Sequence, residues 1–311
     1  MSAQSLRRAA WAGLQDSMPR AALLSLHARV EGVEPSTWEH PALAQLWGPR
    51  YSTYVVPKRD FALFSLGRLP DSPKGRQRAE RMAQWLHAQL DGRRMTDRDA
   101  ARALGVGNAV RYAATTGTVA IRWDGARAPT IWSIPAPEID PVDACRELAR
   151  HYIHVFGPST ADRFARWAGI SRRSAQTAFA SLEGSLLPVR SPLGDEWLLA
   201  EDEPGFGAPE AAPAPARLLP SGDAYFLLDG AERELLVPRP DHRQLLWTPR
   251  VWPGALLVEG EIRGTWRRAQ HTVSIDTWAR LSRGTREAIE AEAATLPLPG
   301  IDRPIQLLWN T

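Results

Sequence analysis

The sequence contains very little cysteine and very little lysine. Its 311 residues include one cysteine, Cys145, so a disulfide framework and a cysteine-based zinc site are both excluded. Of the 38 basic residues only Lys58 and Lys74 are lysine, and the other 36 are arginine. Two explanations stay open for this bias: a GC-rich genome, or the planar guanidinium, which binds phosphate bidentately and stacks on flat rings.

Long apolar runs and familiar nucleotide or metal motifs are also missing. No run approaches the roughly 18–20 apolar residues of a membrane-spanning helix, and the N-terminus has no hydrophobic signal core. The chain lacks GxxxxGK[ST], a GxGxxG after a strand, and HExxH, and its seven histidines are scattered. We therefore expect a cytoplasmic protein with no metal, no cofactor and no membrane contact.

The net charge of +3 is unevenly distributed along the chain. Residues 1–125 carry 18 basic and 11 acidic side chains, a net charge of +7. Residues 126–200 are neutral, and residues 201–311 carry 12 basic and 16 acidic side chains, a net charge of −4. A basic front half indicates a polyanionic partner for that half, although a solvated surface can produce the same excess.

A unit of three helices followed by two strands occurs twice. Apolar residues at helical spacing predict a helix over 78–91, then one that begins at Thr96, then one over 107–115, followed by a hairpin of 118–123 and 130–134. The same order recurs over 141–156, after Ser159, after Ser171, and in a hairpin of 186–191 and 196–201. This order is typical of the winged helix-turn-helix.

The remaining segments complete the predicted architecture. Residues 20–30 and 41–48 are expected to be helical and 52–56 a strand, in a more divergent first unit. Beyond a linker rich in proline and alanine, short strands that include 234–238 and 243–249 precede one helix over 283–295. The predicted class is α+β, with three tandem winged-helix units at 1–70, 71–138 and 139–202, a linker at 203–216, and a small β-barrel-like domain at 217–311.

The second helix of each helix-turn-helix is the one that enters the major groove. The first such helix is expected to expose Asn108 and Arg111, and the second Arg172, Arg173 and Gln176. Arginine pairs with guanine edges or phosphates, and asparagine and glutamine with adenine. We expect these residues to contact double-stranded DNA. The alternative is that the winged helices serve as protein interfaces.

Four segments together resemble the AlkZ-like (YcaQ-like) winged-helix DNA glycosylases, bacterial proteins that excise alkylated purines and unhook interstrand crosslinks. They are residues 13–30, 50–64, 234–268 and 278–293, of which the last two are the more specific. The resemblance spans nearly the whole chain. It implies three winged-helix units joined to a C-terminal β-domain, shaped as a curved channel for duplex DNA, and no cofactor.

The resemblance also implies catalytic positions, at which this chain departs from the family. The family's glutamine–X–glutamine motif corresponds to Gln15–Asp16–Ser17, so the second glutamine is replaced by a shorter serine. Asp16 is a candidate base or electrostatic partner, although alternation along an extended segment points it away from its two neighbours. Arg50 is kept from a second motif and is expected to bind DNA by positioning its sugar-phosphate backbone. The histidine that many relatives carry in that motif is Tyr54 here.

Three functions therefore remain open. The first is a monomeric glycosylase that hydrolyses the N-glycosidic bond of alkylated or crosslinked nucleotides in duplex DNA. Gln15, Asp16, Ser17 and Tyr54 would form its catalytic site. The second is a non-catalytic DNA-binding regulator or lesion-binding factor, and the third is an interaction scaffold. Arg267 and Arg268 on the C-terminal sheet are expected to face phosphates, or else to pair with nearby glutamates.

Overall fold

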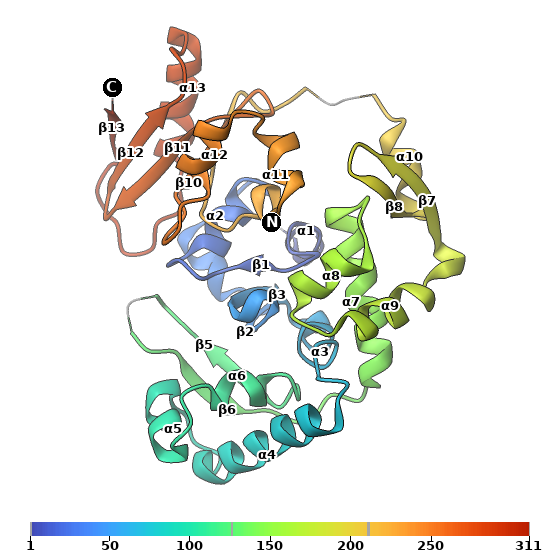
Figure 1. The fold of residues 1–311 in the computed structure, drawn as a ribbon. Coiled ribbons are helices and arrows are strands. Elements are labelled where there is room, and N and C mark those ends of the chain that lie inside the picture. Colours follow the sequence, from blue (N-terminus) through green and yellow to red (C-terminus); the bar gives the residue numbers. More distant parts are fainter. Residues whose placement is uncertain (1, 126, 210–211, 311) are drawn as a thin grey trace. The chain divides into compact units, whose positions relative to one another are not determined.

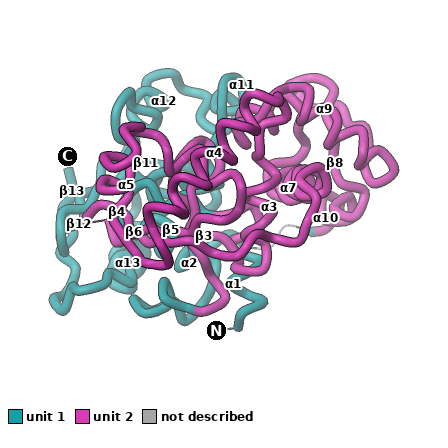
Figure 2. The backbone as a smooth tube through the Cα atoms, turned by 90° about the horizontal axis from the view of Figure 1, so that it is seen from below, with its two compact units in different colours: residues 1–9, 14–40, 209–311 teal, residues 10–13, 41–208 magenta. Residues whose placement is uncertain are grey.

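The computed structural model describes residues 2–125, 127–209 and 212–310, and shows a mixed α+β protein. The chain divides into two compact units (Figure 2). Unit 1 consists of residues 1–9, 14–40 and 209–311, and unit 2 of residues 10–13 and 41–208. Residues 1–70 are thus shared between both units, and each unit is described here by itself.

Unit 2 contains the helices and hairpins of the repeated order (Figure 1). Three helices and a hairpin follow one another twice, as the spacing predicts. The first set is α4 (Pro73–Leu90), α5 (Asp97–Leu104), α6 (Ala109–Ala114), β5 (Val119–Arg122) and β6 (Thr130–Ser133). The second set is α7 (Pro141–Phe156), α8 (Ala161–Ala168), α9 (Arg172–Ala180), β7 (Leu186–Ser191) and β8 (Gly194–Leu199).

The remaining elements of unit 2 are short. They are β2 (Leu43–Trp47), η2 (Pro49–Tyr51), β3 (Thr53–Pro57), η3 (Lys58–Asp60), α3 (Phe61–Leu66), β4 (Met95–Thr96), η4 (Glu183–Ser185), η5 (Ala200–Asp202) and α10 (Glu203–Phe206). The last of these lies inside the predicted linker, of which residues 210 and 211 fall outside the described residues.

Side-chain caps fix where the helices of unit 2 begin. The Thr96 hydroxyl accepts the Asp99 N–H at 3.1 Å, and the Ser171 hydroxyl accepts the Ser174 N–H at 3.0 Å, as predicted. The prediction was wrong for α8, which is capped by Thr160. Ser159 is fully buried instead and is hydrogen-bonded to the Tyr152 hydroxyl at 3.0 Å.

The sheet of unit 2 has the strand order β3-β2-β5-β6-β4. The prediction of a helix over 41–48 was wrong, because β2 pairs antiparallel with both β3 and β5. The Gln45 side chain also accepts the backbone N–H of Trp123 at 2.8 Å. These pairings outweigh the helical propensity of a short segment rich in alanine and leucine. Leu86, Val110 and Ile121 are core residues beneath this sheet.

Unit 1 is built around an open sheet with the order β13-β12-β11-β10-β9. Its elements are α1 (Ala3–Ala9), β1 (Leu14–Gln15), α2 (Ala21–His27), η1 (Pro35–Glu39), β9 (Ala216–Leu219), η6 (Ala224–Phe226), α11 (Ala231–Leu236), α12 (Pro240–Leu246), β10 (Gly254–Val258), β11 (Glu261–Ala269), β12 (Thr272–Thr277), α13 (Arg283–Ala294) and β13 (Gln306–Asn310).

Two expectations for unit 1 were wrong. The sheet is not barrel-like, because the crossover through α13 returns β13 parallel to β12 and leaves β9 and β13 as separate edges. The predicted strands over 234–238 and 243–249 lie in α11 and α12. Glutamates occupy the first turn of α11, and Pro240 occupies the first position of α12, which favours helix over strand at both places.

Strands β10 and β11 form a hairpin, and a hydrophobic core lies beside it. Glu259 and Gly260 both have positive φ, of 50° and 84°, as a two-residue type I′ turn requires. One face of the sheet packs against α2 and α13, with Leu24, Trp266 and Ile289 in a shared core. That packing places the N-terminal segment of unit 1 directly against strands β9 to β11.

Candidate active site

Gln15 and Ser17 form a polar pair at the end of β1. The Gln15 Nε2 donates to the Ser17 hydroxyl oxygen at 2.7 Å. Ser17 is exposed, whereas the Gln15 Oε1 is buried and has no hydrogen-bond partner among the described residues. The serine hydroxyl is therefore the part of this pair that meets solvent, and the glutamine amide lies behind it.

Asp16 points away from its two neighbours, as the alternation predicts. It is 1% exposed, and its Oδ1 accepts the backbone N–H of Ala22 at 3.0 Å in the first turn of α2. Arg20, just before that helix, has a left-handed backbone, and its side chain does not cap the helix. The Asp16 carboxylate instead accepts one of the backbone N–H groups that the first turn of a helix leaves without a partner. The role that this geometry gives Asp16 is to fix the segment that carries Gln15 and Ser17.

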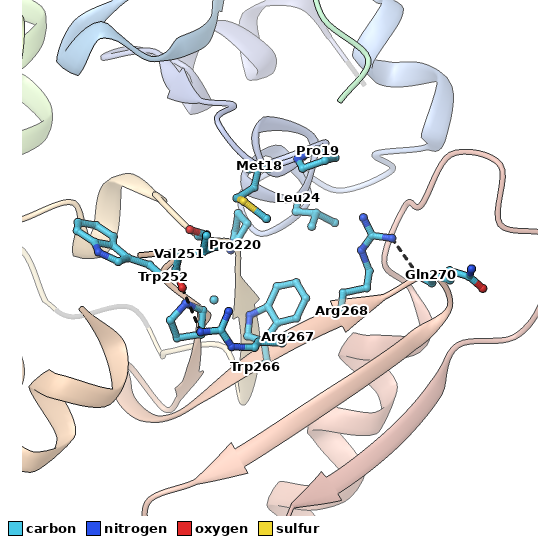
Figure 3. A pocket seen from close by; sticks show the side chains of 14 residues that line it. Met18, Pro19, Leu24, Pro220, Val251, Trp252, Trp266, Arg267, Arg268 and Gln270 are labelled. Atoms are coloured by element: carbon cyan, nitrogen blue, oxygen red, sulfur yellow. Dashed lines mark hydrogen bonds between the residues drawn. The ribbon is translucent and has the colours of Figure 1, made fainter. Parts of the chain in front are cut away.

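A groove of about 300 Å³ lies next to this segment within unit 1 (Figure 3). Its lining combines apolar residues with two arginines. Met18 and Pro19 follow Ser17 directly along the chain, and Trp266 contributes an aromatic ring between the two arginines (Figure 3). Arg267 and Arg268 supply the positive charge from strand β11. A cavity of this character suits a flat, partly apolar group attached to an anion.

Arg267 and Arg268 bond to backbone carbonyls rather than to glutamates. The Arg267 Nη2 donates to the Val251 carbonyl at 3.1 Å, and the Arg268 Nη1 donates to the Gln270 carbonyl at 3.0 Å. Within the described part of the chain neither has a carboxylate partner, and nearby Glu261 pairs with Arg263 at 2.6 Å. Both guanidinium charges thus stay available to an anion at the groove.

The turn that closes over Gln15 was not singled out by the sequence. Gly222 lies so close that a Cβ there would stand 3.0 Å from the Gln15 Nε2. The neighbouring Asp223 is buried and accepts bonds from Ser25 and Arg29. Ser221–Gly222–Asp223 carries an ordinary turn signal. Nothing in the sequence connects that turn to a glutamine some 200 residues earlier.

Tyr54 and Arg50 belong to unit 2, in β3 and η2 respectively, whereas Gln15 and Ser17 belong to unit 1. Tyr54 is 1% exposed, and its ring packs against the backbone of Gly48. Burial raises the pKa of the Tyr54 hydroxyl far above its usual range, and the charge of Arg50 lowers that pKa only in part. Tyr54 is therefore neutral near pH 7 and serves as packing in its own unit.

The DNA-contacting residues predicted on the helices of unit 2 are exposed, whereas Arg50 is half-buried. Asn108 precedes α6 and Arg111 lies on it, and Arg172, Arg173 and Gln176 lie on α9. The Arg111 guanidinium stands 4.8 Å from the centre of the Trp47 ring, a cation–π contact that orients it. Arg172 approaches the carboxylate of Asp162 on α8 at 3.7 Å.

The part of the chain that the structure describes offers neither a metal-binding cluster nor a membrane-spanning helix. Residues 2–125, 127–209 and 212–310 hold no group of three or more histidine, cysteine or acidic side chains able to bind a metal ion. In the same ranges no helix has both the length and the apolar character that a bilayer crossing requires.

Comparison with known proteins places the chain in a family. The family described as DNA glycosylase AlkZ-like matches residues 8–297. The interstrand DNA cross-link repair glycosylase of Streptomyces sahachiroi is 25% identical over 160 residues, which cover 50% of this chain and 42% of that relative. The match thus spans less than half the length of that curated protein.

The solved structure of the Streptomyces sahachiroi DNA glycosylase AlkZ shares the fold. It superimposes with a TM-score of 0.77 at 18% identity and covers 98% of this chain and 94% of that chain. The mixed α+β fold that the sequence predicts is confirmed. With residues 8–297 matched, the chain belongs to the AlkZ-like DNA glycosylase family.

Proposed function

We propose that this protein is a DNA-repair glycosylase that hydrolyses the N-glycosidic bond of an alkylated or crosslinked purine nucleotide in duplex DNA. The observation that carries the proposal is the Gln15–Ser17 pair, with Ser17 exposed and the arginine-lined groove beginning at the next residue. Family membership and the name of the crosslink-repair relative support both the reaction and the substrate class.

The chemistry demands little of the protein. Alkylation makes the purine cationic, so it leaves with the bonding electrons of the glycosidic bond and becomes neutral. A water oxygen forms the new bond to C1′ and releases its proton to solvent. The exposed Ser17 hydroxyl contacts that water, and Gln15 orients Ser17 by donating to its oxygen. Arg267 and Arg268 hold the flanking phosphates and do not touch the base.

DNA binding by unit 2 extends the proposal. The two sets of three helices and a hairpin act as winged-helix units, with α6 and α9 as the helices that face DNA. The groups that read bases or hold phosphates are exposed on Asn108, just before α6, and on Arg111 within it. Arg173 and Gln176 present such groups on α9. The protein acts as a monomer associated with DNA.

One observation favours the alternative of a non-catalytic DNA-binding protein. Asp16 is buried and caps α2, and Tyr54 is buried with a raised pKa, so neither supplies a base that reaches solvent. On this alternative the Gln15–Ser17 pair is only a polar lining. DNA would still bind with a salt dependence set by the number of phosphate contacts.

The deciding experiment incubates the protein with duplex DNA that contains 7-methylguanine and separates the products. The proposal predicts free 7-methylguanine together with an abasic site in the strand. The Ser17→Ala variant should release the base about 10- to 100-fold more slowly, since water positioning of this kind contributes roughly 10²-fold. Retention of DNA without any base release would support the non-catalytic alternative for this lesion.

A further inference from the structure

The turn formed by residues 220–223 lies directly on the Gln15 amide. The Asp223 N–H donates to the Pro220 carbonyl at 3.1 Å and closes the turn. Gly222 has a φ of +77°, and a Cβ built on it would stand 3.0 Å from the Gln15 Nε2 and 3.2 Å from its Cδ. A Cβ at this position would require the Gln15 amide to shift by a few tenths of an ångström, so the backbone of Gly222 forms the wall against which Gln15 rests.

Asp223 holds this turn through four hydrogen bonds. Its carboxylate accepts the Ser25 hydroxyl at 2.6 Å, two Arg29 N–H groups at 2.7 and 2.6 Å, and the Tyr225 backbone N–H at 2.9 Å. Burial alone would raise the pKa of Asp223, but the charge and hydrogen bonds of Arg29 bring it below its usual value. The turn is therefore anchored by a buried, ionised carboxylate.

The same helix, α2, holds the two segments that flank the Gln15 amide. The first turn of α2 holds Asp16, and with it the Gln15–Ser17 segment, through the Ala22 N–H. Ser25 lies toward the other end of α2, and Arg29 lies just after the helix. Both donate hydrogen bonds to Asp223, which keeps the neighbouring Gly222 in place. Pro220, at the start of the turn, and Met18, after Ser17, both line the groove (Figure 3).

We propose that Gly222 and Asp223 are positioning residues for the glycosidic hydrolysis: they set the Gln15 amide so that it orients Ser17 toward the reacting water. This inference rests on the proposed function. Gly222 supplies the close approach, and the Asp223–Arg29–Ser25 network keeps the turn in place. Neither residue touches the substrate, so their effect is on the rate of the chemical step and not on DNA affinity.

The test compares Gly222→Ala with Gly32→Ala. Both glycines lie in unit 1 with nearly equal φ, +77° and +71°, but nothing stands within 4 Å of a Cβ on Gly32. The backbone strain is therefore matched and only the contact with Gln15 differs. Under single-turnover conditions on 7-methylguanine DNA, Gly222→Ala should slow base release about 10- to 100-fold relative to Gly32→Ala, with the DNA dissociation constant within about 3-fold.

A second readout does not depend on activity. In the full-length protein labelled with ¹⁵N, the side-chain amide signals of Gln15 are identified by their loss in Gln15→Ala. They should shift in Gly222→Ala and stay in place in Gly32→Ala. Equal rates for the two glycine variants in an active protein, or unshifted Gln15 signals in Gly222→Ala, would overturn the inference. Absence of base release from the unaltered protein would contradict the proposed function, and the amide signals would still decide the positioning.

Discussion

Removal of the Arg29 guanidinium should destabilise the protein in a way that depends on pH. Arg29→Met keeps the aliphatic stem but leaves the Asp223 carboxylate, of which no side-chain surface is exposed, with only Ser25 and the Tyr225 N–H as donors. Breaking a buried ion pair from one side costs about 3–5 kcal/mol. The Arg29 side chain is 28% exposed, which puts the expected loss of unfolding free energy near 3 kcal/mol at pH 7.

The sign of the pH dependence separates this pair from a simple packing defect. In the unaltered protein the pKa of Asp223 is lowered, so its stabilising contribution is present above the unfolded value of about 4 and is lost as pH falls through the lower folded value. In Arg29→Met, burial without the opposite charge raises that pKa above the unfolded value. The ionised carboxylate then opposes folding, and the penalty grows as pH rises.

Urea denaturation followed by tryptophan fluorescence at pH 5 and pH 7 measures this effect. The stability deficit of Arg29→Met should be smaller at pH 5, by up to about 1.4 kcal/mol for each pH unit over which Asp223 titrates. Arg283→Met is the matched control, because that side chain is 93% exposed and pairs only with Glu287 on the surface. An equal deficit for Arg29→Met at both pH values would refute a raised pKa of Asp223 in the variant, and with it the role of Arg29 in keeping this carboxylate ionised.

Three further predictions concern DNA affinity, thiol reactivity and packing. Arg267→Ala and Arg268→Ala should each weaken DNA binding and reduce the salt slope measured by fluorescence anisotropy by about one, whereas exposed Arg190→Ala in a surface ion pair should change neither as much. Burial raises the pKa of the Cys145 thiol to about 11, so its reaction with Ellman's reagent at pH 8 should be about 100-fold slower than in urea. Gly264→Ala places a Cβ 2.3 Å from a carbonyl of β12 and should cost about 1–3 kcal/mol in the same urea assay, and an unchanged midpoint would contradict that close approach.

The sequence predicted the fold best where local signals and tertiary pairing agree. The helices capped by Thr96 and Ser171 begin where they were predicted. The helix prediction for residues 41–48 was wrong because their conformation depends on strand partners that come later in the chain. The prediction that the C-terminal sheet closes into a barrel was wrong because the crossover connection sets the strand order, and no single strand reveals it.

Part of the candidate site could be predicted from the sequence, and part could not. Alternation along one extended segment was enough to predict that Asp16 points away from Gln15 and Ser17. The wall formed by Gly222 and its support by Asp223 depend on a contact between segments some 200 residues apart. No periodicity or spacing within one sequence carries that information.

The arginine bias has a structural component as well. The Arg20 guanidinium lies 3.6 Å from the centre of the Trp38 ring, and Arg78 lies 3.9 Å from that of Tyr112. A lysine ammonium has no flat face to stack in this way. Some of the arginines of the front half therefore also cover aromatic rings.

The most direct test of the account is the single-turnover rate of base release for Gln15→Ala measured beside Gln244→Ala. Gln244 is an exposed glutamine on α12 of the same unit, so the second variant controls for the loss of an amide. With both proteins saturated with 7-methylguanine duplex DNA, the account predicts a fall of about 100-fold for Gln15→Ala and an unchanged rate for Gln244→Ala. Equal release by the two variants would contradict the assignment of the Gln15–Ser17 pair as the catalytic site.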